Sequence, residues 1–208
     1  MNQTIDLLTS HRSIRKFTDE PVDPDLFTRL VDAAQASASS SFLQGVTIIR
    51  VTDPGKRVAL RDVAGGQAYV ETAPEFLVFC ADLSRPMRCC RQHGGTPAEG
   101  LTEQFVIATV DAALYAQNLV IAAESAGLGI CYIGALRNDP AKVTKLLDLP
   151  QQVYPVFGLC LGHPAQDPEV KKRLARIGVL TVSVESASGL RPADLNGLAD
   201  PYVKATVG

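Results

Sequence analysis

The chain has few histidines, no large excess of charge and no arrangement typical of a hydrolytic triad. With three His among 208 residues, few side chains are available as general bases, and no Ser-His-Asp arrangement stands out. The formal net charge is -2, and the basic residues are dispersed apart from two short clusters. Because a protein that binds duplex nucleic acid normally carries a basic surface, this composition argues against nucleic-acid binding.

Targeting signals and uninterrupted hydrophobic runs are also scarce. The N-terminus MNQTIDLLTSHR has neither the pattern of a signal peptide nor that of a transit peptide. The most apolar region, residues 101–128, is interrupted by six polar or acidic side chains, which favours a buried helix over a membrane span. Five Cys is an odd number, and three of them lie in apolar runs, as expected in a reducing compartment. The sequence therefore predicts a cytoplasmic protein and argues against membrane binding.

The segments that are present predict an α+β or α/β sandwich. Short apolar runs at residues 45–52, 75–82, 127–134 and 154–162 read as strands, and the second is apolar on both faces, as inside a sheet. Asp23-Pro24 and Asp139-Pro140 are helix-start signatures. Residues 99–126 are apolar nearly all round and predict a central helix. The pattern of apolar and polar residues changes near residues 174–177, where we place a domain boundary.

Two motifs that suggest ligands have better structural explanations. CCRQH contains Cys89, Cys90 and His93, but no second ligand pair follows at a spacing typical of zinc sites, so we predict no metal there. Gly127 and Gly129 close a helix and open a strand, which is the reverse of a dinucleotide-binding glycine loop. This pair is predicted to cap the helix.

The stretch HRSIRKFTDEPV, residues 11–22, carries the densest positive charge. If residues 4–10 are helical, Arg12 and Arg15 lie three positions apart just past its end and could bind one phosphate together. A second cluster, Lys171 to Arg173, could converge on the same dianion. The alternative is that both clusters are solvated charged surfaces.

Other polar segments allow two interpretations. The hydroxyl-rich loop ASASSSFLQG, residues 36–45, is either a flexible linker or a hydrogen-bonding lip around a polar cofactor. Gln67 offers amide donors and acceptors suited to the edge of a planar heterocycle. YIGALRN, residues 132–138, ends a strand with a Gly, where a backbone can approach a ligand closely.

Taken together and in order, HRSIRKFTDEPV, ASSSFLQ, GGQ, AQNLVIAAESAGLGICYIGALRN, VTKLLDLP and FGLCLGHPA resemble the flavin-dependent nitroreductase family, in its oxygen-insensitive nitroreductase A and flavin reductase P branch. The resemblance covers residues 1 to about 174. It implies a three-layer α+β sandwich with a central helix, a homodimer, and FMN at the dimer interface.

The resemblance also implies which residues bind the cofactor. They contact the flavin ring or its phosphate, and Glu103 corresponds to an acidic position near the active site. The implied FMN-binding residues are His11, Arg12, Ser13, Arg15, Ser39, Gln67, Tyr132, Ile133, Gly134, Ala135, Lys171 and Arg173. Ala135 is a departure, because close relatives often have Gly there.

The implied activity is a ping-pong reduction of nitroaromatics, quinones or free flavin with NADPH or NADH as donor. Because a flavin carries the redox chemistry itself, no protein nucleophile is required. Residues 175–208 instead resemble the incomplete start of a C2 domain, in which Asp194 and Asp200 match calcium ligands. Two alternatives stay open: a flavin-binding body without turnover, and a calcium- and phospholipid-binding module.

Overall fold

The computed structural model describes residues 2–165 of the chain. Several predictions lie outside these residues, and the structure does not bear on them. They are the domain boundary near residues 174–177, the C2-like segment at residues 175–208, the second basic cluster with Lys171 and Arg173, and the proposed calcium ligands Asp194 and Asp200.

One antiparallel sheet of four strands forms the middle of the described body, in the order β1-β2-β4-β3. All four strands predicted from apolar runs are present, within one or two residues of their predicted ends at most positions. Every residue of β2 is buried, as its two apolar faces predicted. The strands are β1 (Val46–Arg50), β2 (Glu75–Asp82), β3 (Gly129–Ile133) and β4 (Val153–Gly162).

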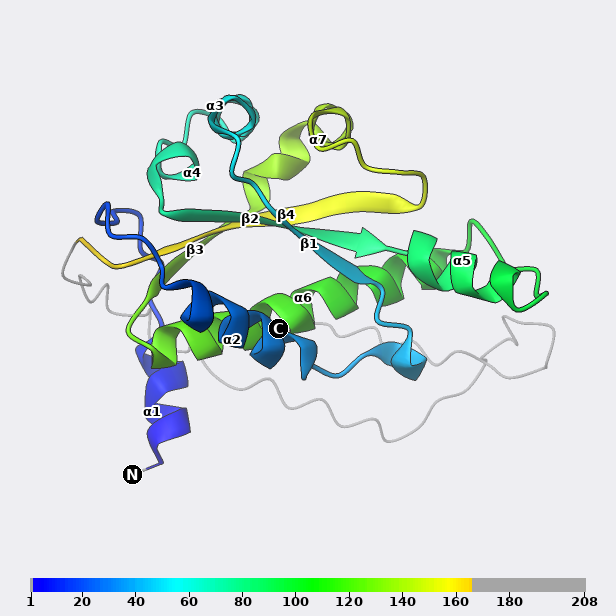
Figure 1. Cartoon of the computed structure of the whole chain (residues 1–208), viewed down its shortest axis with the longest axis horizontal. Coiled ribbons are helices and arrows are strands. Elements are labelled where there is room, and N and C mark those ends of the chain that lie inside the picture. Colours follow the sequence, from blue (N-terminus) through cyan, green and yellow to red (C-terminus); the bar gives the residue numbers. More distant parts are fainter. Residues whose placement is uncertain (1, 166–208) are drawn as a thin grey trace, which may run out of the picture. The chain divides into compact units, whose positions relative to one another are not determined.

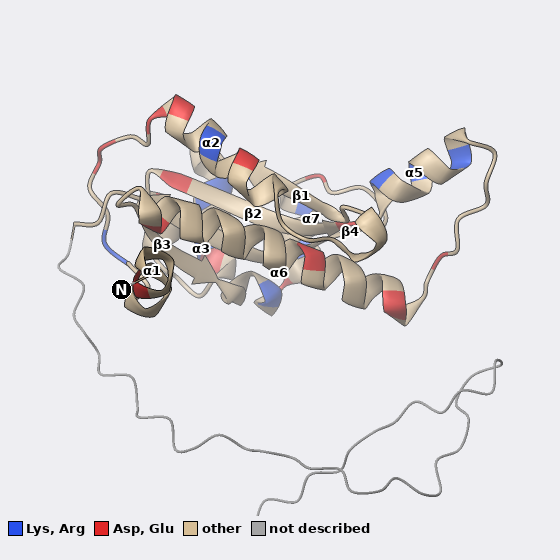
Figure 2. Ribbon diagram, turned by 90° about the horizontal axis from the view of Figure 1, so that it is seen from below, with Lys and Arg blue, Asp and Glu red and all other residues tan. Residues whose placement is uncertain are grey.

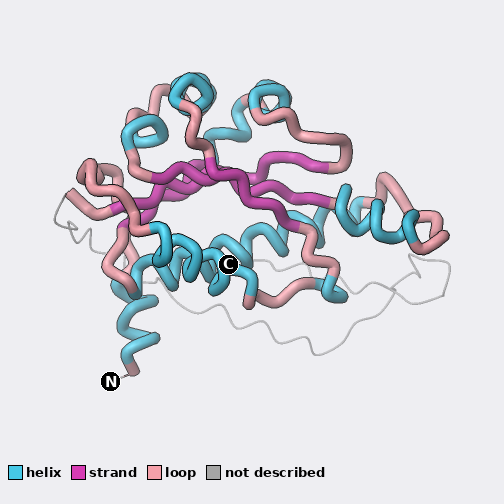
Figure 3. The backbone as a smooth tube through the Cα atoms, viewed as in Figure 1, coloured by secondary structure: helices cyan, strands magenta, loops and turns pink. Residues whose placement is uncertain are grey.

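Helices cover both faces of the sheet, which gives the predicted three-layer α+β sandwich (Figures 1 and 3). Alternate residues of β2 point to opposite layers, because successive side chains of a strand face opposite ways. Phe76 and Val78 enter one core and Leu77 and Phe79 the other. On the first face, here called the α3 side, lie α3 (Pro54–Val63), α4 (Tyr69–Thr72) and α7 (Pro140–Leu146). On the second, the α6 side, lie α2 (Pro24–Gln35) and α6 (Thr102–Ser125).

Aspartate followed by proline starts three of the helices. Asp23 Oδ1 accepts a hydrogen bond from Leu26 N at 2.8 Å and so caps α2, and Asp139 caps α7 in the same way. Asp53 does this for α3, which the sequence interpretation missed. It also missed α4, α5 (Ser84–Gln92) and the short 3-10 turns η1 (Ser40–Phe42) and η2 (Gly134–Asn138). The helix considered for residues 4–10 is present as α1 (Gln3–Ser10).

The central helix α6 is where the sequence predicted it, but only its inner face is covered. Small residues such as Ala108, Ala112 and Ala116 pack against the sheet, while Phe105 and Leu114 on the outer face are 56% and 43% exposed. By length and composition alone the helix could cross a membrane. In the structure it instead lies along the sheet, and its uncovered face is largely free of charge (Figure 2).

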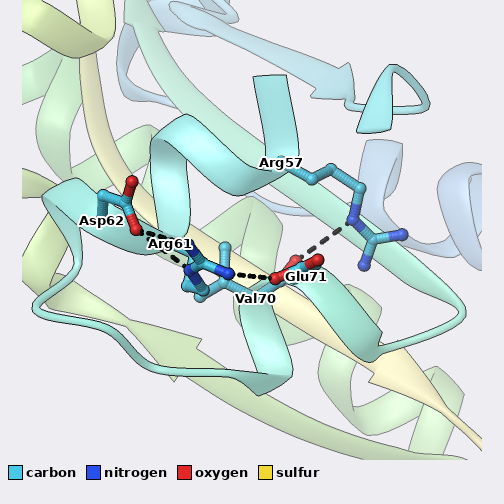
Figure 4. A network of polar contacts seen from close by, with 5 residues as sticks. All are labelled: Arg57, Arg61, Asp62, Val70 and Glu71. Carbon is cyan, nitrogen blue, oxygen red and sulfur yellow. Dashed lines mark hydrogen bonds and ion pairs between the residues drawn. The ribbon is translucent and has the colours of Figure 1, made fainter. Parts of the chain in front are cut away.

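A polar network fixes α4 against α3 (Figure 4). Arg61 donates to Glu71 Oε2 at 2.5 Å, and Arg57 Nε donates to the backbone carbonyl of Val70 at 3.1 Å. Burial lowers the pKa of Arg57, although it stays positively charged at neutral pH. These contacts hold the segment that contains Gln67 in one place beside the sheet.

Candidate functional site

The basic stretch His11 to Thr18 pairs with the start of β3 and with the residues that follow β4. Ile14 N donates to Ile130 O at 2.8 Å, and Thr18 N donates to His163 O at 2.9 Å. The Ile14 side chain is buried and lies so close to Gly129 that a Cβ added there would come within 2.7 Å of it. The basic residues are therefore mounted on a rigid sheet edge, rather than on a free loop.

His11 and Arg12 face the α6 side of that edge. The Nδ1 atom of His11 lies 2.6 Å from Glu124 Oε1, and Arg12 Nη1 donates to His11 O at 2.6 Å. Both residues line a cavity of about 180 Å³ together with Glu124, Gly127 and Gly129.

The Arg12 side chain has an unused donor in this place. Its Nε is buried and has no hydrogen-bond partner among the described residues. A buried unpaired donor costs about 1–3 kcal/mol, so such an atom calls for an explanation. An anionic ligand in the cavity would supply the missing acceptor, and the residues here therefore fit a phosphate-bearing cofactor.

Arg15 lies on the other side of the sheet edge, beside Tyr69 and Cys131. Burial raises the pKa of the Tyr69 hydroxyl, and the neighbouring Arg15 guanidinium opposes that rise. Tyr69 donates to Gln67 Oε1, and Gln67 Nε2 donates to Ala64 O at 2.8 Å. The structure thus brings Arg15 and Gln67 together through Tyr69, which sequence reasoning missed. The spacing Gln67-x-Tyr69 in GGQAYV was its only signal.

Their spacing in the sequence suggested that Arg12 and Arg15 could bind one phosphate together, but the two side chains lie in different places. Arg12 lines the cavity against α6, whereas Arg15 lies against α4 and Cys131 on the α3 side. Ser13, between them, forms the bridge to Ile130 and is exposed. The stretch therefore offers two separate cationic positions along one edge.

The residues at the end of β3 face different sides of the sheet. The Tyr132 ring packs edge-on against Phe157 at 5.1 Å on the α6 side, where burial raises its pKa above the usual range. Ile133 is buried in the core of the α3 side, and Ala135 packs against the same core. A side-chain carbon added to Gly134 would meet the Arg137 guanidinium at 2.9 Å. A ligand beside Arg15 would accordingly meet the peptide groups of this segment rather than the Tyr132 ring.

Ser39 belongs to a different part of the molecule, where the hydroxyl-rich loop is clamped onto α6. Its Oγ donates to Asp111 Oδ2 at 2.7 Å, and the backbone amides of Ser40 and Gly45 donate to the same carboxylate at 3.1 and 3.3 Å. Asp111 is only 3% exposed. The loop is thus an ordered lip beside a cavity of about 320 Å³ rather than a flexible linker.

The predicted site residues fall into two groups that contact α6 at positions far apart along the helix. His11 is tied to α6 at residue 124 and Ser39 at residue 111, and 13 helical positions correspond to about 20 Å. Glu103 lies exposed in the first turn of α6, farther still from His11. One chain therefore does not gather Ser39 and Glu103 with the basic residues.

The remaining motifs behave as structural elements. Cys89 Sγ lies 3.9 Å from His93 Nδ1 on α5, and residues 2–165 contain no group of three side chains suited to a metal ion. Gly127 has a φ of 78° and donates to Glu124 O at 3.1 Å, so it closes α6. The predicted helix cap at Gly127 is confirmed by this arrangement.

Comparisons with known proteins point in one direction. Over 174 residues the chain is 50% identical to the oxygen-insensitive NADPH nitroreductase of Salmonella typhimurium, which covers 84% of this chain and 71% of that protein. It is 48% identical over 181 residues to an FMN reductase (NADPH) of Bacillus subtilis, covering 86% of this chain and 73% of the relative.

Solved structures agree with this result. The NADPH:FMN oxidoreductase from Vibrio harveyi complexed with NAD+ superposes with a TM-score of 0.79 at 45% identity, covering 88% of this chain and 80% of that one. Nitroreductase A from Vibrio parahaemolyticus gives a TM-score of 0.79 at 46% identity, covering 88% and 79%. The model of the nitroreductase family matches residues 8–163. On this sequence and fold evidence, the chain belongs to the nitroreductase family.

Proposed function

We propose that this chain is an FMN-dependent oxidoreductase that takes a hydride from NADPH or NADH and reduces a small nitroaromatic, quinone or flavin substrate. The observation that carries the proposal is the 50% identity over 174 residues to an NADPH nitroreductase. The nitroreductase family model, which matches residues 8–163, includes the basic stretch. FMN, when bound, supplies the redox chemistry by accepting two electrons and passing them on.

The described residues would bind and orient the cofactor. The buried, unpaired Nε of Arg12 and the neighbouring His11, which line one cavity, suit an anionic phosphate. Arg15, with Gln67 and Tyr69, offers a cation and an ordered amide to the ring and its negative charge. Peptide groups of residues 132–135 would lie along the ring, because the side chain of Tyr132 packs on the α6 side.

The active form in this proposal is a homodimer formed through α6. Its outer face exposes Phe105, Val106, Val110 and Leu114, and α1 adds exposed Ile5 and Leu8. Covering a half-exposed apolar side chain contributes about 1 kcal/mol, so a patch of this size supports stable pairing. A second copy is the favoured occupant because its Ser39 lip would complete a site whose two halves lie about 20 Å apart in one chain.

Location and partners follow the same proposal. The described cysteines are all free, and Cys80, Cys131 and Cys160 are buried, which supports a reducing cytoplasmic location. The partners are small-molecule electron acceptors and a second copy of the chain.

A spectrum tests the proposal directly. The purified protein is expected to be yellow, or to become so with added FMN, and NADPH should bleach the flavin band under nitrogen until a nitroaromatic restores it. Protein that stays colourless after FMN addition would contradict the proposal. Flavin that is retained but not bleached by NADPH would instead identify a flavin-binding body without turnover.

A further inference from the structure

The helix α5 carries positive charge that no acidic residue of the helix balances. Its sequence SRPMRCCRQ contains three Arg and neither Asp nor Glu, and Figure 2 shows the basic residues along it. Arg85, Arg88 and Gln92 are spaced three and four positions apart, so they lie on one face of the helix. Arg91 lies on a different face and forms an ion pair with Glu99. The charge of Arg91 is thus compensated by a neighbouring carboxylate.

The face with Arg85 and Arg88 forms one wall of a groove of about 590 Å³, here called the α5 groove. The opposite wall is the end of the hydroxyl-rich loop, residues 42–44. Arg85 Nη1 donates to Val46 O at 3.2 Å, which holds that guanidinium beside β1, whereas Arg88 is exposed. None of the described residues that line the groove is an Asp or a Glu. Its volume lies in the range of small-molecule sites, about 300–1,000 Å³, and its charge suits an anion.

The loop side of the α5 groove presents an aromatic ring in a strained backbone. Phe42 is 79% exposed and has a φ of 56°, and its neighbours Ser41 and Gln44 have φ values of 49° and 52°. Bulky residues rarely adopt a positive φ, which costs about 1–3 kcal/mol, and such residues cluster at ligand sites. An exposed ring opposite two guanidinium groups offers a face on which a planar heterocycle can stack while its anionic group meets the arginines.

The α5 groove is continuous with the cavity beside Ser39. Phe42, Gln44 and Arg85 line both of them, so the groove begins where the lip of the proposed flavin site ends. A molecule that has one end at the flavin and the other end in the groove must be long, anionic and planar at its far end. A nicotinamide dinucleotide has all three properties, because its adenosine half carries phosphates and a purine.

We propose that the α5 groove binds the adenosine half of the nicotinamide donor. Arg88 and Arg85 contact its phosphate oxygens, and the purine stacks on Phe42. Arginine suits this task because its planar fork of donors matches phosphate oxygens with two parallel hydrogen bonds. The inference rests on the proposed function, because it takes NADPH or NADH as the electron donor.

A redox-inactive fragment of the donor tests the site without any turnover. Adenosine 2′,5′-bisphosphate, which has no nicotinamide, is titrated into the purified protein by isothermal titration calorimetry. Arg88→Ala should raise its Kd about tenfold, as expected for the loss of a charged hydrogen bond. Arg91→Ala is the matched control on the same helix, and it should change the Kd by less than about twofold. Wild-type protein that does not bind the fragment, or equal losses in the two variants, overturns the inference.

Steady-state kinetics show which phosphate is bound. Arg88→Ala should lower kcat/KM for NADPH about tenfold and leave kcat/KM for the nitroaromatic unchanged, because in a ping-pong reaction the donor has left before the acceptor binds. A loss for NADPH alone assigns Arg88 to the 2′-phosphate, and an equal loss for NADH assigns it to the pyrophosphate that both donors share. Unchanged kinetics with both donors overturn the inference alone, whereas wild-type flavin that NADPH does not reduce overturns the proposed function as well.

The thiol of Cys89 gives an independent test that needs no substitution. Cys89 is exposed and lines the α5 groove. Adenosine 2′,5′-bisphosphate, at a concentration that saturates binding in the calorimeter, should slow modification of Cys89 by a disulfide reagent at least about fivefold, the fraction of time that the groove stays occupied. Adenosine, which has no phosphate, should give no protection at the same concentration. An unchanged rate at Cys89, located by peptide mass mapping, would place the fragment elsewhere and overturn the inference.

Discussion

Two carboxylates of α6, Asp111 near the middle of the helix and Glu124 in its last turn, have different partners. Near the N-terminal half, Asp111 is almost fully buried and accepts three hydrogen bonds, all from neutral donors of one loop. Near the C-terminal end, Glu124 Oε1 lies 2.6 Å from Nδ1 of His11, which comes 113 positions earlier in the sequence. Asp111 therefore holds a loop in place, whereas Glu124 ties the residue after α1 to the end of α6. Since about 20 Å of helix separates them, the residues that we propose for one flavin site lie in two separate places of a single chain.

The largest effect is expected from a substitution that disrupts the exposed apolar face of α6, through which we propose that two chains pair. Leu114→Glu places a charge in the middle of the exposed apolar face of α6. Burying an unpaired carboxylate costs several kcal/mol, so the variant should be monomeric, with half the wild-type mass by light scattering. Gln117→Glu, one turn farther along the helix, is a matched control with a smaller expected shift. An unchanged mass for Leu114→Glu would argue against pairing through α6.

Removing the Asp111 carboxylate tests whether this residue stabilises the fold. Asp111→Ala leaves the Ser39 hydroxyl and the amides of Ser40 and Gly45 without their acceptor. We expect a loss of about 3 kcal/mol of unfolding free energy, or roughly 6–12 °C in Tm, measured by thermal unfolding. Asp32→Ala, which removes an exposed carboxylate of α2, should change Tm by less than about 2 °C. Equal changes in Tm for the two variants would show that Asp111 does not hold the loop in place.

The sequence predicted much of this fold because local signals were strong. Residues 75–82 are apolar on both faces and became a buried inner strand, and Asp23-Pro24 and Asp139-Pro140 started helices as expected. Asp53-Pro54 carried the same signal and was overlooked. The outer face of α6 was misjudged because an apolar face covered by the core and one left for a partner have the same composition.

The site was less predictable than the fold. The basic stretch was visible, but its division into an α6-side pair and Arg15 depends on pairing with Ile130, which lies more than 100 positions away. Tyr69, Asp111 and Glu124 carry no motif of their own. Their roles arise from contacts across 2, 72 and 113 positions, and only the first is short enough for sequence reasoning.

Arg15 and Lys16 are neighbouring basic residues whose alanine variants can be compared directly. Both are exposed, but Arg15 lies beside Tyr69 and Cys131, whereas Lys16 is held only through its backbone carbonyl, which accepts from Ala165 N. Arg15→Ala should weaken FMN binding about 10- to 100-fold in a fluorescence titration, as expected for a charged hydrogen bond. Lys16→Ala should change it less than about threefold. Equal FMN affinities of the two variants would indicate that the basic stretch is a charged surface that does not bind FMN.

The smallest effect is expected for thiol reactivity, which compares exposed with buried cysteines. Cys89 on α5 is exposed, whereas burial raises the pKa of Cys131 beside Arg15, and that of Cys80 to about 12. Because the thiolate is the reactive form, a disulfide reagent at pH 8 should modify Cys89 first and Cys90 more slowly. The other three should react only after unfolding. Fast modification of Cys131, located by peptide mass mapping, would contradict the structure at that end.

The central claim, that two chains build one flavin site, is tested most directly by titrating FMN into monomeric Leu114→Glu. This variant keeps His11, Arg12, Arg15 and Glu124 but has no partner to supply the Ser39 lip. Our account predicts that its fold, followed by circular dichroism, stays intact while FMN affinity falls at least about 100-fold, the equivalent of several lost hydrogen bonds. A folded monomer that binds FMN as tightly as the wild type would contradict the account.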